Sequence, residues 1–377
     1  MKEVALIGMA QSLFFLVIVV LKKEKQLKDY LLMSFFLFIG AELLYRFLLK
    51  IDIQFYNSPL VLFDIIYWAL FGPVLLLYCK SVIDKNFKLK KKHLIHLILL
   101  VISVLSVLKY LLNRSNYNTF IEYYNLQTGV TKFGLLIWEF TSAIYIFFVL
   151  IILFNHKKKI KNYFSNLEKK ELNWLLFLTL GFAIYIYSSY VYWILKDIFN
   201  IHLGFRFIDI LGLLLTVYVF GLGIFGYKQE GIFFDSELLT FHNGIIKPSN
   251  PKYQKTGLTL EEKESLNIKL VEVMKKEKPF LESEITIKDL ALQVGTSVHK
   301  LSQVINEKHK RNFFDFINFY RINEVKKLLV DSTIEDSKIE LIAYDCGFSS
   351  KSAFYSIFKK HTLQTPTEFR QKQKVAV

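Results

Sequence analysis

The chain has 377 residues, of which 53% are hydrophobic and only 21% are charged, and its mean hydropathy is +0.33. This composition excludes a disordered or fibrous protein and argues against an ordinary soluble enzyme, because too few polar side chains are available to cover a globule of this size. The formal net charge of +15 requires an anionic partner, either nucleic acid or the anionic face of a membrane. Two cysteines, Cys79 and Cys346, are too few for a disulfide framework or a four-thiolate zinc site.

The first 226 residues contain seven apolar segments, and a transmembrane helix needs roughly 20 mostly apolar residues. The segments are residues 4–21, 30–49, 59–83, 94–112, 134–154, 172–195 and 207–226. The core of a soluble domain cannot accommodate seven such runs, so we expect a seven-helix transmembrane bundle. The first segment lacks a small-x-small cleavage site and is followed by further spans, which argues against a cleaved signal peptide.

Lysines lie mainly on one side of this predicted bundle. The loops after the first, third and fifth segments hold four, five and six lysines, whereas the other side holds only five basic residues. Cytoplasmic loops of membrane proteins carry the excess of lysine and arginine. We therefore expect the N-terminus outside and the C-terminal half in the cytoplasm. Most of the net positive charge of the chain then belongs to these loops.

Several ionisable residues fall within the predicted spans, where a charge is costly unless it faces the bundle interior or a watery cavity. Glu42 and Arg46 are four residues apart on one helix face and can neutralise each other. One interpretation is an intramembrane sensing site for a ligand or ion, and the other is structural pairing within the bundle. The candidate residues are Glu42, Arg46, Asp64, Glu139 and Asp209.

Residues 227–257 are expected to be a cytoplasmic linker, because the turn-rich stretch from Pro248 to Pro251 cannot continue a helix. Thr259 and Glu262 then form a capping-box pattern that predicts the start of a new helix. From there the sequence is mixed in charge and helical in pattern, and strand signals are few throughout. We predict an all-α fold with a transmembrane domain at 1–226, the linker, and a soluble domain at 258–377.

Two stretches of the C-terminal domain, 287–305 and 339–358, match each other. Each is typical of a short helix, a tight turn at Gly295 or Gly347, a serine N-cap and a second helix. This is the helix-turn-helix pattern. A single copy could be any small αα-hairpin, but two copies with matching core positions favour the motif. Between them, residues 313–330 carry apolar side chains at the spacing of one long linking helix.

The second copy resembles the signature of AraC/XylS-type transcription regulators. Its matching residues are Ile342, Ala343, Cys346, Gly347, Phe348, Ser352, Phe354, Tyr355, Phe358, Lys359, Lys360, Thr365, Pro366, Phe369 and Arg370. The first half of the family pattern is matched by Leu290, Ala291, Ser297, Leu301, Ser302, Phe314, Ile317 and Arg321. The family usually has a glycine before the linking helix, where this chain has Lys310. The seven-span half before such a domain resembles membrane-tethered members of the family.

The resemblance implies that the second helix of each motif enters the major groove of double-stranded DNA, with the two motifs roughly 34 Å apart on one DNA face. Gln303 could bond adenine and Lys351 guanine. The candidate base contacts are Val298, His299, Ser302, Gln303, Lys351, Ser352, Tyr355 and Ser356, and the candidate phosphate contacts are Arg311, Asn312, Lys359 and Lys360. The alternative for His299 and for the two adjacent lysines is an ordinary solvated surface.

Other polar residues of the domain have a structural interpretation. Arg321 and Glu324 are expected to brace the linking helix rather than touch DNA. Cys346 lies in the second turn against the core, where an inert packed thiol is favoured over a redox sensor.

Motifs for catalysis are lacking: the sequence has no phosphate-cradling glycine loop, no HExxH and no nucleophile elbow. His93 and His96 lack a third ligand in sequence, so we expect neither an enzyme nor a metal or cofactor site. The predicted function is a one-component transcription regulator in the bacterial cytoplasmic membrane. Its partners would be DNA, the lipid bilayer and an unidentified small-molecule or membrane cue, with a homodimer as one arrangement. The alternatives are a transporter or a membrane scaffold with a fused regulatory domain.

Overall fold

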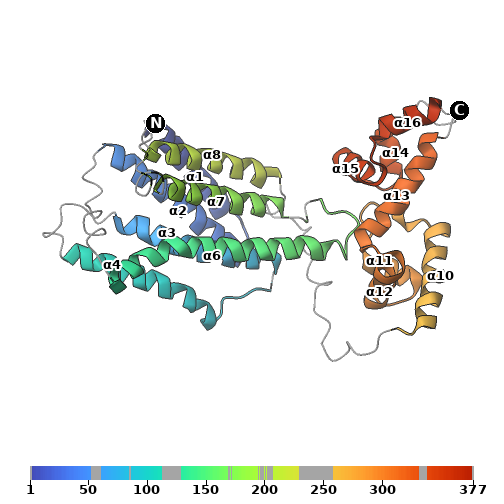
Figure 1. Cartoon of the computed structure of the whole chain (residues 1–377), viewed down its shortest axis with the longest axis horizontal. Helices are drawn as coiled ribbons and strands as arrows, with labels where there is room; N and C mark the ends of the chain where they lie inside the picture. The colour runs from blue at the N-terminus through green and yellow to red at the C-terminus, as the bar shows by residue number, and fades with distance from the viewer. Residues whose placement is uncertain are drawn as a thin grey trace. The chain divides into compact units, whose positions relative to one another are not determined.

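The computed structural model describes residues 2–51, 61–84, 86–112, 129–168, 170, 172–193, 195, 199, 201, 207–228, 258–330 and 338–375. The chain divides into two compact units. The N-terminal unit comprises Met1–Phe154 and Leu172–Thr240, and the C-terminal unit comprises Asn155–Glu171 and Phe241–Val377. Apart from one isolated β-bridge, the named elements of the described residues are helices, as predicted (Figure 1).

Helices occupy each of the seven apolar segments. They are α1 (Lys2–Val20), α2 (Leu27–Ile51), α3 (Val61–Ile83), α4 (Leu97–Leu112), α6 (Gly129–Ile160), α7 (Asn173–Trp193) and α8 (Phe207–Lys228), with a 3-10 helix at Lys91–His96 before α4.

By length and composition, however, only two stretches of the described residues could cross a membrane, Glu3–Val20 and Leu27–Leu48. Three other apolar stretches of described residues are shorter than 18 residues, namely Ala69–Ile83 in α3, Asn173–Ser188 in α7 and Ile210–Ile224 in α8. Two helices of this kind also occur in soluble cores and in signal sequences. The seven predicted helices are therefore present, whereas seven membrane spans are not established.

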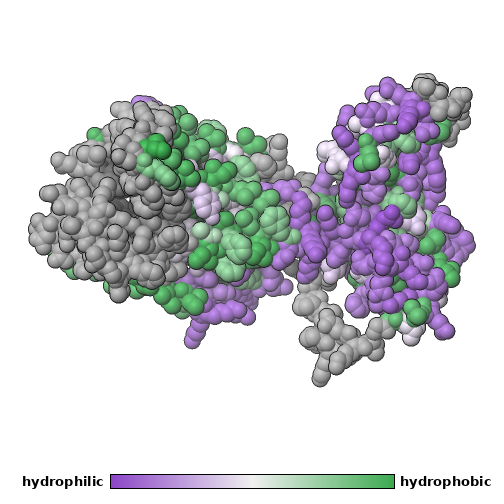
Figure 2. Space-filling view, viewed as in Figure 1, coloured by the Kyte–Doolittle hydropathy of each residue, from purple (hydrophilic) through white to green (hydrophobic). Residues whose placement is uncertain are grey.

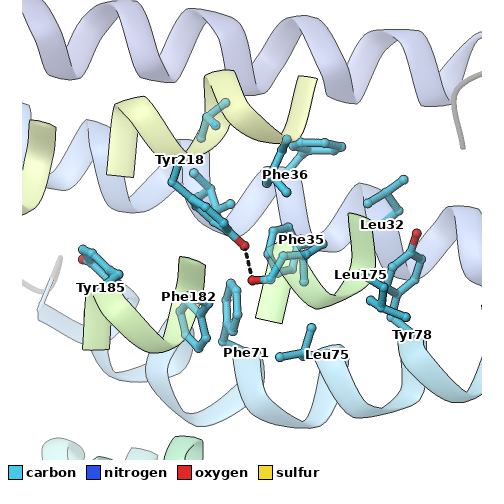
Figure 3. Packing of buried hydrophobic residues seen from close by; sticks show 14 of the residues in the cluster. Leu32, Phe35, Phe36, Phe71, Leu75, Tyr78, Leu175, Phe182, Tyr185 and Tyr218 are labelled. Carbon is cyan, nitrogen blue, oxygen red and sulfur yellow. Dashed lines mark hydrogen bonds between the residues drawn. The ribbon is translucent and has the colours of Figure 1, made fainter. Parts of the chain in front are cut away.

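The N-terminal unit is held together by aromatic side chains. Phe35 of α2, Phe71 of α3 and Phe182 of α7 are buried side by side, with the rings of Phe35 and Phe71 4.5 Å apart (Figure 3). Tyr218 of α8 lies against Gly181 of α7, where an added Cβ would be 2.4 Å from the tyrosine ring. Its hydroxyl donates to the Leu178 carbonyl at 2.6 Å. Gly181 therefore lets α7 and α8 approach closely enough to bury Tyr218 with its hydroxyl hydrogen-bonded.

The C-terminal unit contains the predicted repeat. After α10 (Leu260–Lys276) and a 3-10 turn at Pro279–Leu281, the helices are α11 (Ile287–Val294), α12 (Val298–His309), α13 (Phe313–Val330), α14 (Ile339–Asp345), α15 (Lys351–Thr362) and α16 (Pro366–Val375). The capping box is confirmed, since Thr259 and Glu262 exchange side-chain to backbone hydrogen bonds. The predicted linker lies outside the described residues except for Tyr227 and Lys228, which end α8.

The two motifs have matching turns. Gly295 and Gly347 both adopt positive φ, at 71° and 85°, and Ser297 and Ser350 each cap the helix that follows. Lys310, where the family pattern has glycine, also lies in the left-handed region with φ 53°. The backbone at the end of α12 thus adopts the conformation that glycine favours, although the residue there is a lysine.

Helix α13 contributes to two hydrophobic cores. Phe313, Phe316 and Ile317 in its first half are buried with α10, α11 and α12. Residues in its second half, among them Ile322 and Val325, are buried with α14 and α15. This arrangement places one motif at each end of a single helix (Figure 1).

The two turn glycines should respond differently to substitution. At Gly295 an added Cβ meets nothing within 4 Å, so Gly295→Ala should cost only the roughly 1–2 kcal/mol of a left-handed non-glycine residue. At Gly347 the added Cβ would lie 2.5 Å from the Phe280 carbonyl oxygen, so Gly347→Ala should cost about 1–3 kcal/mol more. Urea unfolding of a 258–377 fragment measures both. Equal losses of stability would contradict the close approach at Gly347.

Candidate nucleic-acid interface

The second helix of each motif has an apolar and a polar face. In α12, Leu301, Val304 and Ile305 are at most 1% exposed, and in α15 Phe354 and Phe358 are fully buried. His299 on α12 and Lys351, Ser352, Ser356 and Lys359 on α15 are exposed on the outer side. The inner faces anchor the helices, so the polar faces are the ones that can meet a groove of DNA.

On α12 two of the candidate base contacts, Ser302 and Gln303, already have local partners. Gln303 donates from Nε2 to Oε1 of Glu307 at 2.9 Å, and Glu307 in turn pairs with Lys263 at 2.7 Å. Asn306 donates to the Ser302 carbonyl at 2.8 Å. Val298 is half-buried against the first core rather than fully presented. To contact a base, Gln303 must therefore give up its hydrogen bond to Glu307.

On α15, Lys351 forms an ion pair with Glu340 of α14, with Nζ and Oε1 2.6 Å apart. The same ammonium group lies 5.5 Å from the centre of the Tyr355 ring. The hydrogen bond from Lys351 lowers the pKa of the Glu340 carboxyl. Lys351 is nevertheless largely exposed, so it can turn toward a guanine by giving up one surface ion pair, which costs little.

Three of the four candidate phosphate contacts line one hollow of about 250 Å³. Its lining consists of Lys310, Arg311, Asn312, Asp315, Lys360 and His361. Lys359 is exposed on α15 and is not among them.

Residues of this hollow also have structural partners. Asn312 accepts the Asp315 backbone N–H at 2.9 Å, Lys360 pairs with Asp315 at 3.0 Å, and the Arg311 guanidinium lies 3.9 Å from the centre of the Phe319 ring. Burial, with Lys360 nearby, lowers the pKa of His361, so its ring is largely neutral at pH 7. The cations around the hollow thus outnumber its one carboxylate, which suits an anion such as a phosphate.

Arg321 and Glu324 have the structural partners expected of them. Arg321 is only 2% exposed and donates to the carbonyl oxygens of Phe280 and Glu282, each at 2.7 Å. Burial lowers its pKa to about 10, so it is still a cation at pH 7. Glu324 binds Lys278 at 2.6 Å and Lys327 at 3.1 Å. Both residues therefore fasten α13 to its surroundings.

Of the intramembrane candidates, the structure brings Glu42 and Arg46 together, with Arg46 Nη2 and Glu42 Oε1 2.6 Å apart. Tyr185 of α7 completes the group, because its hydroxyl donates to Glu42 at 2.9 Å and accepts from Arg46 at 2.6 Å. These contacts join α2 to α7. The side chains of Asp64, Glu139 and Asp209 lie outside the described residues. Nowhere in the described part of the chain do three metal-ligating side chains cluster.

A segment that the sequence did not point to also belongs to this unit. Residues 161–168 and 170 lie on α11, α13 and the start of α15, where Ser165 is only 2% exposed and Glu168 contacts Ser349 and Ser350. In the sequence this segment is visible only as one of the lysine-rich loops.

Comparison with known proteins agrees with this geometry. Residues 290–372 match a family model described as a helix-turn-helix domain. An uncharacterized HTH-type transcriptional regulator of Staphylococcus aureus strain COL is 36% identical over 87 residues, which cover 23% of this chain and 11% of that protein. The uncharacterized regulator YijO of Escherichia coli strain K12 is 28% identical over 89 residues, which cover 24% and 30% of the two chains. The matched region thus spans less than a third of these curated relatives.

A solved structure of a protein of unknown function from Listeria innocua aligns with a TM-score of 0.25 and 26% identity, covering 28% of this chain and 94% of the other.

The fold, the paired recognition helices and the matched model define residues 290–372 as a helix-turn-helix DNA-binding domain. These residues thus form an AraC-type helix-turn-helix domain, and the two curated proteins that share this region are described as HTH-type transcriptional regulators.

The environment of Cys346 predicts a thiol of low reactivity. The side chain is 1% exposed, and burial raises its pKa to about 12. Only the thiolate reacts, and its fraction falls about tenfold for each pH unit below the pKa. At pH 8 the folded 258–377 fragment should therefore react with iodoacetamide about a thousandfold more slowly than an ordinary thiol. Its rate should rise on unfolding in urea, whereas fast labelling of the folded fragment would favour a redox role.

Proposed function

We propose that this chain is a membrane-embedded, one-component transcription regulator that binds specific DNA sequences through its two helix-turn-helix motifs. The observation that carries the DNA-binding half is the pair of recognition helices, α12 and α15, held at the two ends of α13 with polar faces exposed. A rigid connection of this kind lets one protein chain read two adjacent major-groove segments. An enzyme is not favoured, because the matched relatives are described as regulators.

The surface of the N-terminal unit supports the membrane part of the proposal. On the face seen in Figure 2, much of its described surface is hydrophobic, with a hydrophilic patch along the lower edge, whereas the surface of the C-terminal unit is largely hydrophilic. Only 28% of the apolar stretch Glu3–Val20 is buried, and Phe14, Val17 and Leu21 are each more than half exposed. A helix that is apolar on all sides and yet exposed is typical of contact with lipid. The lysine-rich loops would then face the cytoplasm.

A topology experiment tests this placement. We expect a fluorescent protein fused after Val377 to be fluorescent in bacterial cells, because the C-terminus is proposed to be cytoplasmic. Alkaline phosphatase inserted within residues 113–128, proposed to be outside, should be active. Release of the full-length chain from membranes by high salt or carbonate would contradict the proposed bilayer insertion.

Base readout is tested by binding-site selection with the 258–377 fragment, followed by substitution. Because a bidentate side-chain contact to a base is worth about 1–3 kcal/mol, Gln303→Ala and Lys351→Ala should each weaken binding to the selected site roughly ten- to hundredfold and relax the preference at one base pair. Lys276→Ala is the control, since this exposed lysine lies on α10, outside the two recognition helices, and pairs with Glu272. Unchanged binding by both variants would contradict the assigned base contacts.

The N-terminal unit is proposed to sense a small-molecule or membrane cue and to pass its state to the DNA-binding domain. If DNA affinity and target transcription were the same for the full-length chain and the 258–377 fragment under every stimulus tested, this sensing role would fail. A transporter would instead show flux in liposomes. A scaffold with an inactive domain would yield no selected DNA site.

A further inference from the structure

The C-terminal unit includes a segment from the middle of the sequence, residues 161–170, here called the docked loop. It follows α6 in the chain and precedes α7, almost ninety residues before α10 begins. Phe164 forms an antiparallel bridge with Thr286, the N-cap residue of α11. Around it Ile160, Phe164 and Leu167 make a small buried cluster with Tyr163 and Phe314. The segment is therefore packed on the helix-turn-helix domain as part of its fold.

The docked loop supplies hydrogen-bond acceptors to the first turns of domain helices. The Ile287 N–H at the start of α11 donates to the Tyr163 carbonyl at 3.0 Å, and the Phe314 N–H in α13 donates to the Lys161 carbonyl at 2.9 Å. Such N–H groups have no partner within their own helix. The loop is thus bound to the first backbone N–H groups of these helices, which need an acceptor from outside the helix. Water can supply that acceptor when the loop is absent.

Ser165 anchors the centre of the loop beneath α13. Its hydroxyl donates to the Ile285 carbonyl at 2.7 Å and accepts from Arg321 Nη2 at 3.3 Å. On the outer side, Lys170 pairs with Glu284 at 2.8 Å. These contacts fix the first motif to the loop.

Glu168 reaches the second motif. Its Oε2 accepts a hydrogen bond from the Ser349 hydroxyl at 3.1 Å, and its Oε1 accepts one from the Ser350 hydroxyl. Ser350 is the N-cap of α15, and its oxygen also accepts the Ala353 N–H at 3.3 Å. A carboxylate thus lies at the N-terminal end of the second recognition helix, directly before Lys351 and Ser352.

That end of a recognition helix is the part that meets DNA in helix-turn-helix proteins. Serine hydroxyls and helix N-termini are groups that bind backbone phosphates, and a carboxylate offers them the same kind of anionic oxygen. A phosphate and Glu168 cannot both occupy the hydroxyls of Ser349 and Ser350, and their like charges repel. A phosphate at these two hydroxyls would require the Glu168 end of the loop to leave.

We infer that the docked loop is an autoinhibitory segment in which Glu168 takes the place of a DNA phosphate at the start of α15. The loop joins α6 to α7, so a change in the N-terminal unit can reach the recognition helix through this covalent connection. The inference rests on the proposed DNA-binding function. To the proposed function it adds the group that opposes DNA binding, Glu168, and the surface that Glu168 occupies, the start of α15.

The test is DNA affinity of the full-length chain purified in detergent, measured on the DNA site selected as above. Glu168→Gln keeps the shape of the side chain and removes its charge. Because hydrogen bonds to a charged group are the stronger ones, the variant should bind DNA about tenfold more tightly than the unaltered chain. Glu272→Gln is the matched control, since it removes one exposed carboxylate from α10, where its partner is Lys276. Its DNA affinity should be unchanged.

A covalent lock gives a second, self-controlled measurement. Paired positions of an antiparallel bridge are close enough for a disulfide, so Phe164→Cys with Thr286→Cys can hold the loop in place. Oxidation should lower DNA affinity about tenfold relative to the reduced form of the same protein, and reduction should restore it.

The outcomes are distinguishable. If Glu168→Gln binds no more tightly than the unaltered chain, or if the locked and reduced forms bind equally, autoinhibition is wrong while DNA binding stands. If Glu272→Gln gains as much affinity as Glu168→Gln, the effect is one of net charge, and the assigned contact is wrong. If no form of the chain binds any selected DNA, the proposed function fails and this inference fails with it.

Discussion

The C-terminal unit depends on one constraint, which is that α13 must fill two hydrophobic cores at once. Its first half is buried with the first motif and its second half with the second. Neither motif could bury its short helices without this shared element, because α11 and α14 have only eight and seven residues. Isolated helices of that length are unstable in water. The separation of the recognition helices is therefore set by the packing that makes the motifs stable.

Arg321 links that constraint to the rest of the unit. It is buried in the middle of α13, between the residues of the two cores, and binds backbone carbonyl groups of the turn before α11. A guanidinium cation is tolerated there because several oxygens share its N–H groups. The same cation also binds Ser165, so the centre of α13 is the place where the motifs and the docked loop meet.

The sequence predicted much of this arrangement. Local patterns are sufficient for the repeat, because the turn glycines, the serine caps and the apolar spacing each act within a few residues, and all three are confirmed. The left-handed conformation of Lys310 was not predicted, because the family pattern indicated only that a lysine stands where glycine is usual. The Glu42–Arg46 pair follows from helical spacing. Its third member, Tyr185, does not, because it comes from a distant helix.

The docked loop could not be predicted for the same reason. Its anchors are backbone carbonyl groups, one serine and one carboxylate, and none of these forms a motif. The lysines around them indicated only a cytoplasmic loop. For the seven apolar segments, hydropathy correctly located the helices. The number of helices that cross a membrane and their orientation stay predictions. Base contacts likewise remain predictions, because the partners that the side chains have now are not those they would have on DNA.

The capping of α11 by the Tyr163 carbonyl has a consequence for how such domains can be exchanged. A helix-turn-helix domain is commonly regarded as a cassette that can be cut at its linker and joined to another sensor. Here a cut in residues 229–257 would separate the domain from acceptors and a buried serine that belong to the other side of the junction. A chimera that keeps the inhibition inferred above would have to carry residues 155–171 together with the C-terminal domain, or replace them with a loop of matching register. Modularity in this chain therefore follows the compact unit and not the linear order of its segments.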